Sequence, residues 1–446
     1  MEFDFANSNA HICLNRKRCF SILLLLNCTL ACLYYTYVQN QPDGTKYNSN
    51  NAKGIHINFN KNQSSIKPSK PIEYIRTILE NEYNYDDLVK FYNLNEKEFS
   101  LGLRCARKSK RIETTTQVNY TGDTTSKNNS TTISSSPIAT TSQVDSLYTS
   151  PYYRYQRKTF FTFVIDHADV CLNESIDLLI MIISKSDNYK TRDAIRRTWG
   201  SGENLGDYSS IRMKLFFLID FDEKLSTNIR LENDLFHDII QVELPPQYTL
   251  VTYRVLSLFE WSFRFCRRAK FLFKTDDDIF INLILLLKFI SPRLDKPTNN
   301  SFLIPEMTIY GYKHYRPGVF RQANDPVGAR YVITPDEFPC SHYPDFLSGF
   351  GYVMSKKGRD AIIYAAYRNT DKPFRISDVY LTGILPDYLS IERQPLSDYT
   401  IRYQGSCENF FENSKAFACA AGLHHGDSTD VFDKFNRYWQ YVKKSL

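Results

Sequence analysis

Between residues 151 and 446, short runs of apolar residues alternate with stretches in which apolar residues recur at helical spacing. We expect strands in the apolar runs and helices between them. The expected strands are 160–165, 178–183, 215–219, 239–244 and 271–273, and the expected helices are 191–198, 228–235 and 253–264. This alternation predicts one α/β domain over 151–446, built on a mostly parallel central sheet with flanking helices. Domains of this class bind nucleotides at the carboxyl ends of their strands.

The first residues follow a different pattern. Residues 19–38 contain no charged side chain, and twenty residues suffice to span a bilayer as a helix. The basic residues Arg16, Lys17 and Arg18 precede this run and are expected to stay in the cytosol. We therefore predict a cytoplasmic tail over 1–18 and a transmembrane signal anchor over 19–38, with the rest of the chain in a lumen. No cleavage site with small residues follows, which disfavours a cleaved signal peptide.

Residues 39–150 are rich in Asn, Ser, Thr and Lys and are expected to form a lumenal stem that is largely disordered. Residues 71–105 are an exception, because their apolar residues have helical spacing and indicate a short ordered island. Glycosylation sequons agree with a lumenal, glycosylated chain. They begin at Asn62, Asn119, Asn128, Asn129, Asn173 and Asn299.

The net charge bears on the expected partners, and the cysteine content bears on the expected disulfides. The formal net charge is only +6, and the dense basic clusters at 16–18 and 104–111 lie outside the expected domain, so we expect no nucleic-acid partner. Six cysteines follow the expected anchor: Cys105, Cys171, Cys266, Cys340, Cys407 and Cys419. In an oxidising lumen some of them should form disulfides, and the pairing cannot be deduced from the sequence.

Three consecutive aspartates end the apolar run at 271–273. Side chains alternate along a strand, so Asp276 and Asp278 point to one side and Asp277 to the other. Two carboxylates on one side repel each other unless a cation lies between them, which favours a divalent metal that holds a phosphate ligand. Phe280 excludes an Asp-x-Asp-x-Thr phosphatase, and residues 279–287 lack the further ligands of an EF-hand. The alternative, a solvated acidic turn, is disfavoured by the apolar flanks.

Four blocks in a fixed order carry a resemblance to a known family. They are 192–200 (RDAIRRTWG), 274–282 (KTDDDIFIN), 343–355 (YPDFLSGFGYVMS) and 378–383 (DVYLTG). Over about 160–443 the chain resembles the inverting β1,3-glycosyltransferases, which include β1,3-galactosyl- and β1,3-N-acetylglucosaminyltransferases. The resemblance implies a GT-A nucleotide-sugar domain, a Golgi membrane location, a UDP-sugar donor, manganese as the usual metal, and a glycan acceptor on glycoprotein or glycolipid.

Arg192 and Arg196 lie four residues apart on an expected helix, so both guanidinium groups can face one diphosphate. A solvated basic helix face is the alternative. For the acidic block, the resemblance implies that Asp276 contacts the nucleotide, that Asp278 binds the metal, and that Asp277 helps to hold the loop. Trp199 is expected in the core.

Gly349 and Gly351 permit close approach of the backbone to a ligand, and the resemblance places them beside the donor sugar and the acceptor. We take Asp378 as the catalytic base, because inversion needs one carboxylate to remove the proton of the acceptor hydroxyl. The family usually has an acidic residue where this chain has Ser377, and the following loop is one residue longer. These departures leave the choice of donor and acceptor open.

The sequence also offers two candidate metal ligands near its end. His424 and His425 precede an aromatic stretch at 432–439, where the resemblance places a histidine, and either imidazole would suit manganese better than magnesium. The expected activity is transfer of a hexose, with galactose favoured and N-acetylglucosamine as the nearest alternative. A lumenal binding protein of the same fold without turnover is the alternative from another class, and only Ser377 supports it.

Overall fold

The computed structural model describes residues 71–83, 159–172, 174–203, 205–294, 307–369, 372–396, 407, 417–420 and 431–444. The expected tail (1–18) and anchor (19–38), and most of the expected stem, lie outside these residues. Within the described ranges, no helix combines the length and the apolar character needed to cross a bilayer.

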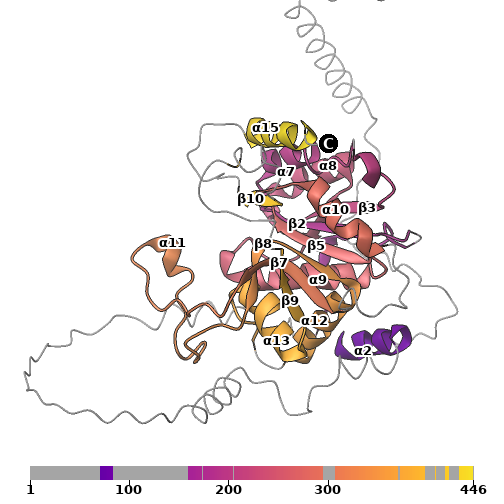
Figure 1. Cartoon of the computed structure of the whole chain (residues 1–446). Coiled ribbons are helices and arrows are strands. Elements are labelled where there is room, and N and C mark those ends of the chain that lie inside the picture. The colour runs from indigo at the N-terminus through magenta and orange to yellow at the C-terminus, as the bar shows by residue number, and fades with distance from the viewer. Residues whose placement is uncertain are drawn as a thin grey trace, which may run out of the picture. The chain divides into compact units, whose positions relative to one another are not determined.

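An eight-stranded sheet forms the centre of the domain, in the order β1-β4-β3-β2-β5-β8-β7-β9 (Figure 1). The strands are β1 (Phe163–Ile165), β2 (Leu178–Ile183), β3 (Met213–Asp220), β4 (Ile239–Val242), β5 (Phe271–Asp276), β7 (Thr308–His314), β8 (Phe346–Ser355) and β9 (Glu392–Pro395). Strands β4, β3, β2 and β5 are parallel, whereas β8 is antiparallel to both β5 and β7. The predicted mostly parallel sheet is therefore confirmed. A small second sheet pairs β6 (Ile279–Ile281) with β10 (Ala418–Ala420).

Helices cover both faces of the large sheet (Figure 1). They are α2 (Pro71–Glu82), α7 (Tyr189–Arg196), α8 (Ser226–Phe236), α9 (Val251–Arg264), α10 (Leu283–Leu294), α11 (Pro326–Ala329), α12 (Lys356–Arg368), α13 (Leu385–Leu389) and α15 (Val431–Lys444), with a π-helical segment at Val379–Ile384. The expected helices correspond to α7, α8 and α9, with boundaries that differ by a few residues.

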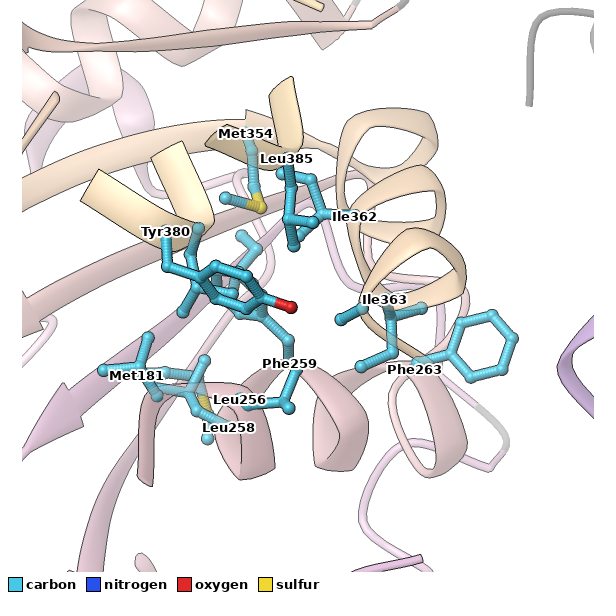
Figure 2. Close-up of a cluster of buried hydrophobic side chains, with 14 of the residues drawn as sticks. Met181, Leu256, Leu258, Phe259, Phe263, Met354, Ile362, Ile363, Tyr380 and Leu385 are labelled. Atoms are coloured by element: carbon cyan, nitrogen blue, oxygen red, sulfur yellow. The ribbon is translucent and has the colours of Figure 1, made fainter. Parts of the chain in front are cut away.

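Strand β2 shows why the sheet has two cores. Its side chains alternate, so Leu179 and Met181 enter one hydrophobic core while Leu178 and Ile180 enter the other. A strand covered on both faces must be apolar at every position, which explains its unbroken apolar run. Figure 2 shows Met181 packed in the first core, among side chains of α9, α12 and α13. Trp199 is fully buried in the second core, as expected.

Helix α2 lies within the segment expected to be stem, yet it packs on the domain. Ile75 and Leu79 are fully buried in the first core. At its end, the Tyr83 hydroxyl donates to Asp360 at 2.6 Å, and the Lys356 ammonium lies 2.7 Å from Glu82. Residues Lys67–Leu446 accordingly form one compact unit. The ordered island expected over 71–105 is thus, in its described part, an element of the domain.

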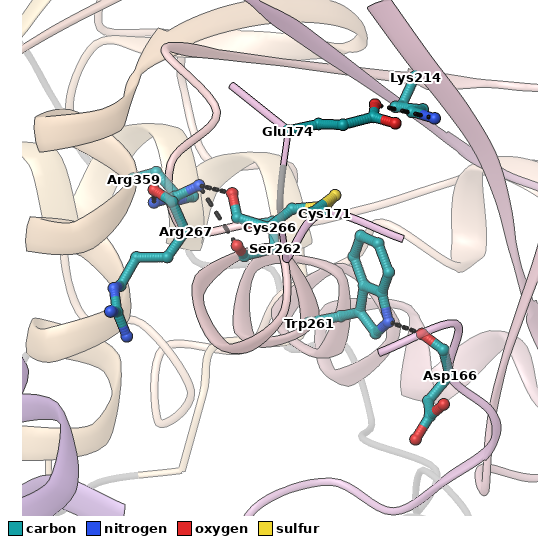
Figure 3. The surroundings of a disulfide bond; sticks show 9 residues. All are labelled: Asp166, Cys171, Glu174, Lys214, Trp261, Ser262, Cys266, Arg267 and Arg359. Carbon is teal, nitrogen blue, oxygen red and sulfur yellow. Dashed lines mark hydrogen bonds and ion pairs between the residues drawn. A yellow bond between two sulfur atoms is a disulfide. The ribbon is translucent and has the colours of Figure 1, made fainter. Parts of the chain in front are cut away.

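Disulfides join segments that are distant in sequence. Cys171, before β2, is bonded to Cys266 at the end of α9, close to the Trp261 indole, which donates to the Asp166 carbonyl at 2.5 Å (Figure 3). Cys407 is bonded to Cys419, and Cys340 is also disulfide-bonded. The prediction that some of the six cysteines form disulfides is confirmed.

Candidate active site

The carboxyl ends of β2 and β5 bring two polar segments to the same edge of the sheet. Ile183 pairs with Asp276 in the parallel register, so the residues that follow each strand lie side by side. The Ser184 hydroxyl donates to Asp277 at 2.6 Å, and the Asn188 amide donates to the same oxygen at 2.9 Å. Asp277 is buried and points into the protein, so it holds the loop that carries Asp276 and Asp278.

Lys274 links β5 to β8 at this edge. Its buried ammonium donates to Asp276 at 2.6 Å and to the Gly349 carbonyl at 2.8 Å. Lys274 and Asp276 are two residues apart in one strand, so both side chains lie on the same side. The ion pair therefore fixes the Asp276 carboxylate, which keeps 36% of its side chain exposed.

Asp378 lies at the start of the π-helical segment and faces the same residue of β8. The Gly349 N–H donates to its carboxylate at 2.8 Å, and the Ser377 hydroxyl lies 3.4 Å from the other oxygen. Burial raises the pKa of Asp378, and the charge of Asp276 adds to the rise, against the lowering effects of Lys274, Gly349 and Ser377. A carboxylate with a raised pKa is a better proton acceptor, which suits a general base.

Gly349 and Gly351 were predicted to allow close approach to a ligand, and in the structure both make close contacts with other residues of the protein. A Cβ at Gly349 would lie 2.6 Å from an oxygen of Asp378, so any side chain there would displace this carboxylate. A Cβ at Gly351 would lie 3.1 Å from the ring of Phe273. The requirement for glycine at 349 thus comes from the candidate base.

The structure corrects the expectation that Arg192 and Arg196 face a diphosphate. Arg192 is fully buried, and its guanidinium donates to both oxygens of Glu232, at 2.8 and 2.7 Å, and to Ser184 at 3.0 Å. Arg196 makes a two-bond ion pair with Asp238, at 2.8 and 2.7 Å. The four-residue spacing does place both on one helix. Acidic residues of α8 and of the turn after it, however, occupy the guanidinium groups.

Asp278 and Asp276 are the carboxylates that fit a cation. Asp278 is exposed as a residue, yet loss of water around its carboxyl group raises its pKa to about 7, with further contributions from Asp276 and Asp277. A nearby cation would relieve this repulsion, and carboxylate oxygens suit Mn²⁺ or Mg²⁺. In the described part of the chain no three His, Cys, Asp or Glu side chains group as a metal site. The other predicted ligands, His424 and His425, lie outside the described residues.

Sequence reasoning missed several residues of this site. Lys274 had a usable signal, because it stands two positions before Asp276 on the same side of an expected strand. Ser184 and Asn188 follow another strand, and only the parallel register places them against Asp277.

These residues lie in a region that is similar to a known family. Residues 190–397, which carry Lys274, the three aspartates, Gly349 and Asp378, match the family model described as galactosyltransferase. Over these residues the chain is similar to galactosyltransferases. The resemblance expected from the sequence is therefore confirmed.

Curated relatives of this chain are named for two different sugars. Beta-1,3-galactosyltransferase bre-2 of Caenorhabditis elegans is 30% identical over 226 residues, 50% of this chain and 60% of that protein. Mouse beta-1,3-galactosyltransferase 1 is 31% identical, over 50% of this chain and 63% of its own length. Lactosylceramide 1,3-N-acetyl-beta-D-glucosaminyltransferase of Xenopus tropicalis is 26% identical, over 54% and 61% respectively. The chain thus spans about three fifths of the length of these relatives.

Among solved structures, the apo form of mouse xyloside xylosyltransferase 1 aligns with 56% of this chain and 98% of its own, at 10% identity and a TM-score of 0.29. A likeness this weak carries no argument about function.

Proposed function

We propose that the domain transfers galactose from UDP-galactose to a hydroxyl of a glycan acceptor on glycoprotein or glycolipid, with inversion and formation of a β1,3 linkage. One observation carries this proposal. The Gly349 backbone donates to Asp378 at 2.8 Å and accepts from Lys274 at 2.8 Å, and Lys274 in turn holds Asp276. One residue of β8 thereby fixes the candidate base and a donor-side carboxylate in a single network.

In this mechanism Asp378 accepts the proton of the acceptor hydroxyl as that oxygen attacks the anomeric carbon, and UDP departs from the opposite face. A single carboxylate is sufficient for inversion. Asp278, with Asp276 beside it, would hold a manganese ion, and His424 or His425 remains the imidazole ligand expected from the sequence. When bound, the metal would neutralise charge that builds up on the departing diphosphate. Arg192 and Arg196 have no part in this step, because protein carboxylates hold them.

N-acetylglucosamine is the second candidate sugar. The relatives named above include a lactosylceramide N-acetylglucosaminyltransferase at an identity close to that of the galactosyltransferases. In this proposal the site provides the base and contacts the diphosphate end of the donor, and neither feature distinguishes the two sugars.

We also propose a Golgi location, with the domain in the lumen and the anchor at 19–38. The disulfide between Cys171 and Cys266 supports an oxidising compartment.

The test is UDP release by residues 67–446, produced in an oxidising host, across a panel of UDP-sugars with manganese present or chelated. We expect manganese-dependent release from one donor in the presence of acceptor, lost in Asp378→Asn. Release from UDP-N-acetylglucosamine alone would select the second candidate. No release from any donor would favour the binding protein without turnover.

A further inference from the structure

The connection between β7 and β8 lies at the same edge of the sheet as the aspartate triplet. β8 runs antiparallel to β5, with Thr275 opposite Gly351, and His314 at the end of β7 is opposite Phe346 at the start of β8. The connection over 315–345 therefore leaves and re-enters the sheet beside the end of β5. Antiparallel neighbours need only two to five connecting residues, so an ordered connection of about 30 residues indicates a function.

Two arginines order this connection. Arg321 donates to the carbonyls of Ile333, Phe338 and Cys340, at 2.8, 2.8 and 2.7 Å. Arg375 donates to the Arg330 carbonyl at 2.6 Å and to Glu337 at 2.8 Å. Arg375 precedes the candidate base Asp378 by three residues. The segment around Arg330 is therefore held to the same short stretch of chain that positions the base.

This segment carries one of two exposed tyrosines that meet beside the site. Tyr331 is 45% exposed, and its hydroxyl lies 3.1 Å from that of Tyr248, which is 49% exposed on the turn after β4. The guanidinium of Arg330 lies 5.1 Å from the centre of the Tyr248 ring. Burial raises the pKa of the Tyr248 hydroxyl, as do Tyr331 and the negative charge of Asp378, which places the pair within electrostatic reach of the base.

We propose that Tyr248 and Tyr331 form the acceptor subsite, where they hold a sugar ring of the glycan whose hydroxyl Asp378 deprotonates. This inference rests on the proposed function. A sugar ring offers an apolar C–H face to an aromatic ring and hydroxyls to the polar tip, and tyrosine supplies both. Isolated surface aromatics need no explanation, but these two come from distant segments and are fixed by hydrogen bonds at the site edge. The acceptor must reach Asp378, and this pair is tied to the Asp378 segment.

The test compares acceptor use with donor use in Tyr248→Ala, Tyr331→Ala and the double variant. The acceptors are benzyl β-galactoside and benzyl β-N-acetylglucosaminide, and the readouts are acceptor KM, UDP release without acceptor, and UDP affinity. We expect acceptor KM to rise about tenfold or more for each variant, the equivalent of about 1.4 kcal/mol, while the two donor readouts change by less than about twofold. The Tyr→Phe variants keep the ring and should lose less. Leu235→Ala, at a 71% exposed position of α8, is the control for loss of an exposed apolar side chain.

An unchanged acceptor KM, or an equal loss of UDP affinity, would overturn the acceptor assignment. If the unaltered protein releases no UDP from any donor, the proposed transferase fails, and binding of the two benzyl glycosides is then followed by saturation-transfer NMR. If the unaltered protein binds the glycosides and the double variant does not, Tyr248 and Tyr331 form a glycan-binding site in a protein without turnover. Binding that is unchanged in the double variant, or absent in the unaltered protein, would reject the subsite.

Discussion

Arg192 shows how the role of a side chain depends on residues far along the chain. Its spacing from Arg196 indicates a diphosphate ligand, but Glu232 and Ser184 take its guanidinium, and Ser184 also donates to Asp277. Arg192 therefore supports the aspartate loop from behind. It would affect the site indirectly, by way of Ser184 and Asp277, rather than by contact with a bound ligand.

Arg192→Met should lower the free energy of unfolding by about 3 kcal/mol, because it leaves buried polar groups unpaired. It should also weaken binding of UDP with manganese. If Arg192 instead bound the diphosphate directly, the substitution would weaken UDP binding and leave the free energy of unfolding unchanged. Denaturant unfolding measures the free energy of unfolding, and calorimetric titration measures the affinity for UDP with manganese. Arg197→Met is the control, because the Arg197 side chain is 55% exposed and its surface pair with Asp193 should contribute less than about 1 kcal/mol.

Gly349 is the residue where a single methyl group tests the base. In Gly349→Ala the new Cβ would lie 2.6 Å from an oxygen of Asp378, so the carboxylate must move. We expect kcat/KM to fall about a hundredfold, the lower range of what a general base contributes. Gly318→Ala is the matched control, since a Cβ there would meet nothing within 4 Å apart from its neighbours in the chain. Equal kcat/KM in the two variants would contradict the placement of Asp378.

Glu260 gives stability a pH dependence. It is fully buried in α9, and burial raises the pKa of its carboxyl to about 7, despite bonds from Arg264 at 2.9 Å and from the Phe161 N–H at 2.9 Å. The folded state therefore holds a proton that the unfolded chain releases near pH 4.5. The resulting stability is complete below that pH and is lost as pH rises through about 7, by about 3 kcal/mol at most.

Glu260→Gln removes this titration. Relative to the variant, the unaltered protein should lose unfolding free energy between pH 5 and 8, as followed by denaturant unfolding at each pH. A difference that stays constant over this range would show that Glu260 does not titrate there.

At the scale of elements, the pattern of apolar residues predicted the features that depend on local burial, namely strands and the side to which a side chain points. The unbroken apolar run at 178–183 became β2, and the alternation of the three aspartates placed Asp277 inside and Asp276 and Asp278 outside. Contacts between segments that are distant in the sequence could not be predicted from this pattern. The register that brings Ser184 to Asp277 and the packing of α2 on α12 depend on tertiary arrangement, which a single sequence does not reveal.

Helix α2 should contribute to the stability of the domain. Leu79 is fully buried in the first core, so Leu79→Ala should cost about 2 to 5 kcal/mol. Thr77→Ala is the control, because Thr77 is exposed and its hydroxyl donates within its own helix, at 2.9 Å to the Glu73 carbonyl. Its effect should stay within about 0.5 kcal/mol. A chain that starts at residue 151 should show the same loss as Leu79→Ala or a larger one. Full stability of this shortened chain would mean that α2 packs without stabilising.

At the scale of the whole molecule, the candidate site joins segments that the sequence holds far apart. Ser184 follows β2, Lys274 and Asp276 belong to β5, Gly349 belongs to β8, and Asp378 directly precedes the π-helical segment. A ligand held at this edge binds only the folded chain and therefore stabilises all of these segments together. Ligand binding is then measurable as global stability, even without a known acceptor.

UDP and manganese together, at about a hundred times their dissociation constant, should add about 2.7 kcal/mol and raise the unfolding midpoint by about 4 °C or more. A metal held by Asp278 would neutralise the charge of the diphosphate, so UDP with a chelator should give a clearly smaller shift. Asp278→Asn is the matched variant: Asp278 is exposed, so its loss should leave the ligand-free midpoint nearly unchanged while removing most of the shift. Differential scanning calorimetry of both proteins decides this, since an equal shift in the variant, or with chelator, would place the metal away from Asp278.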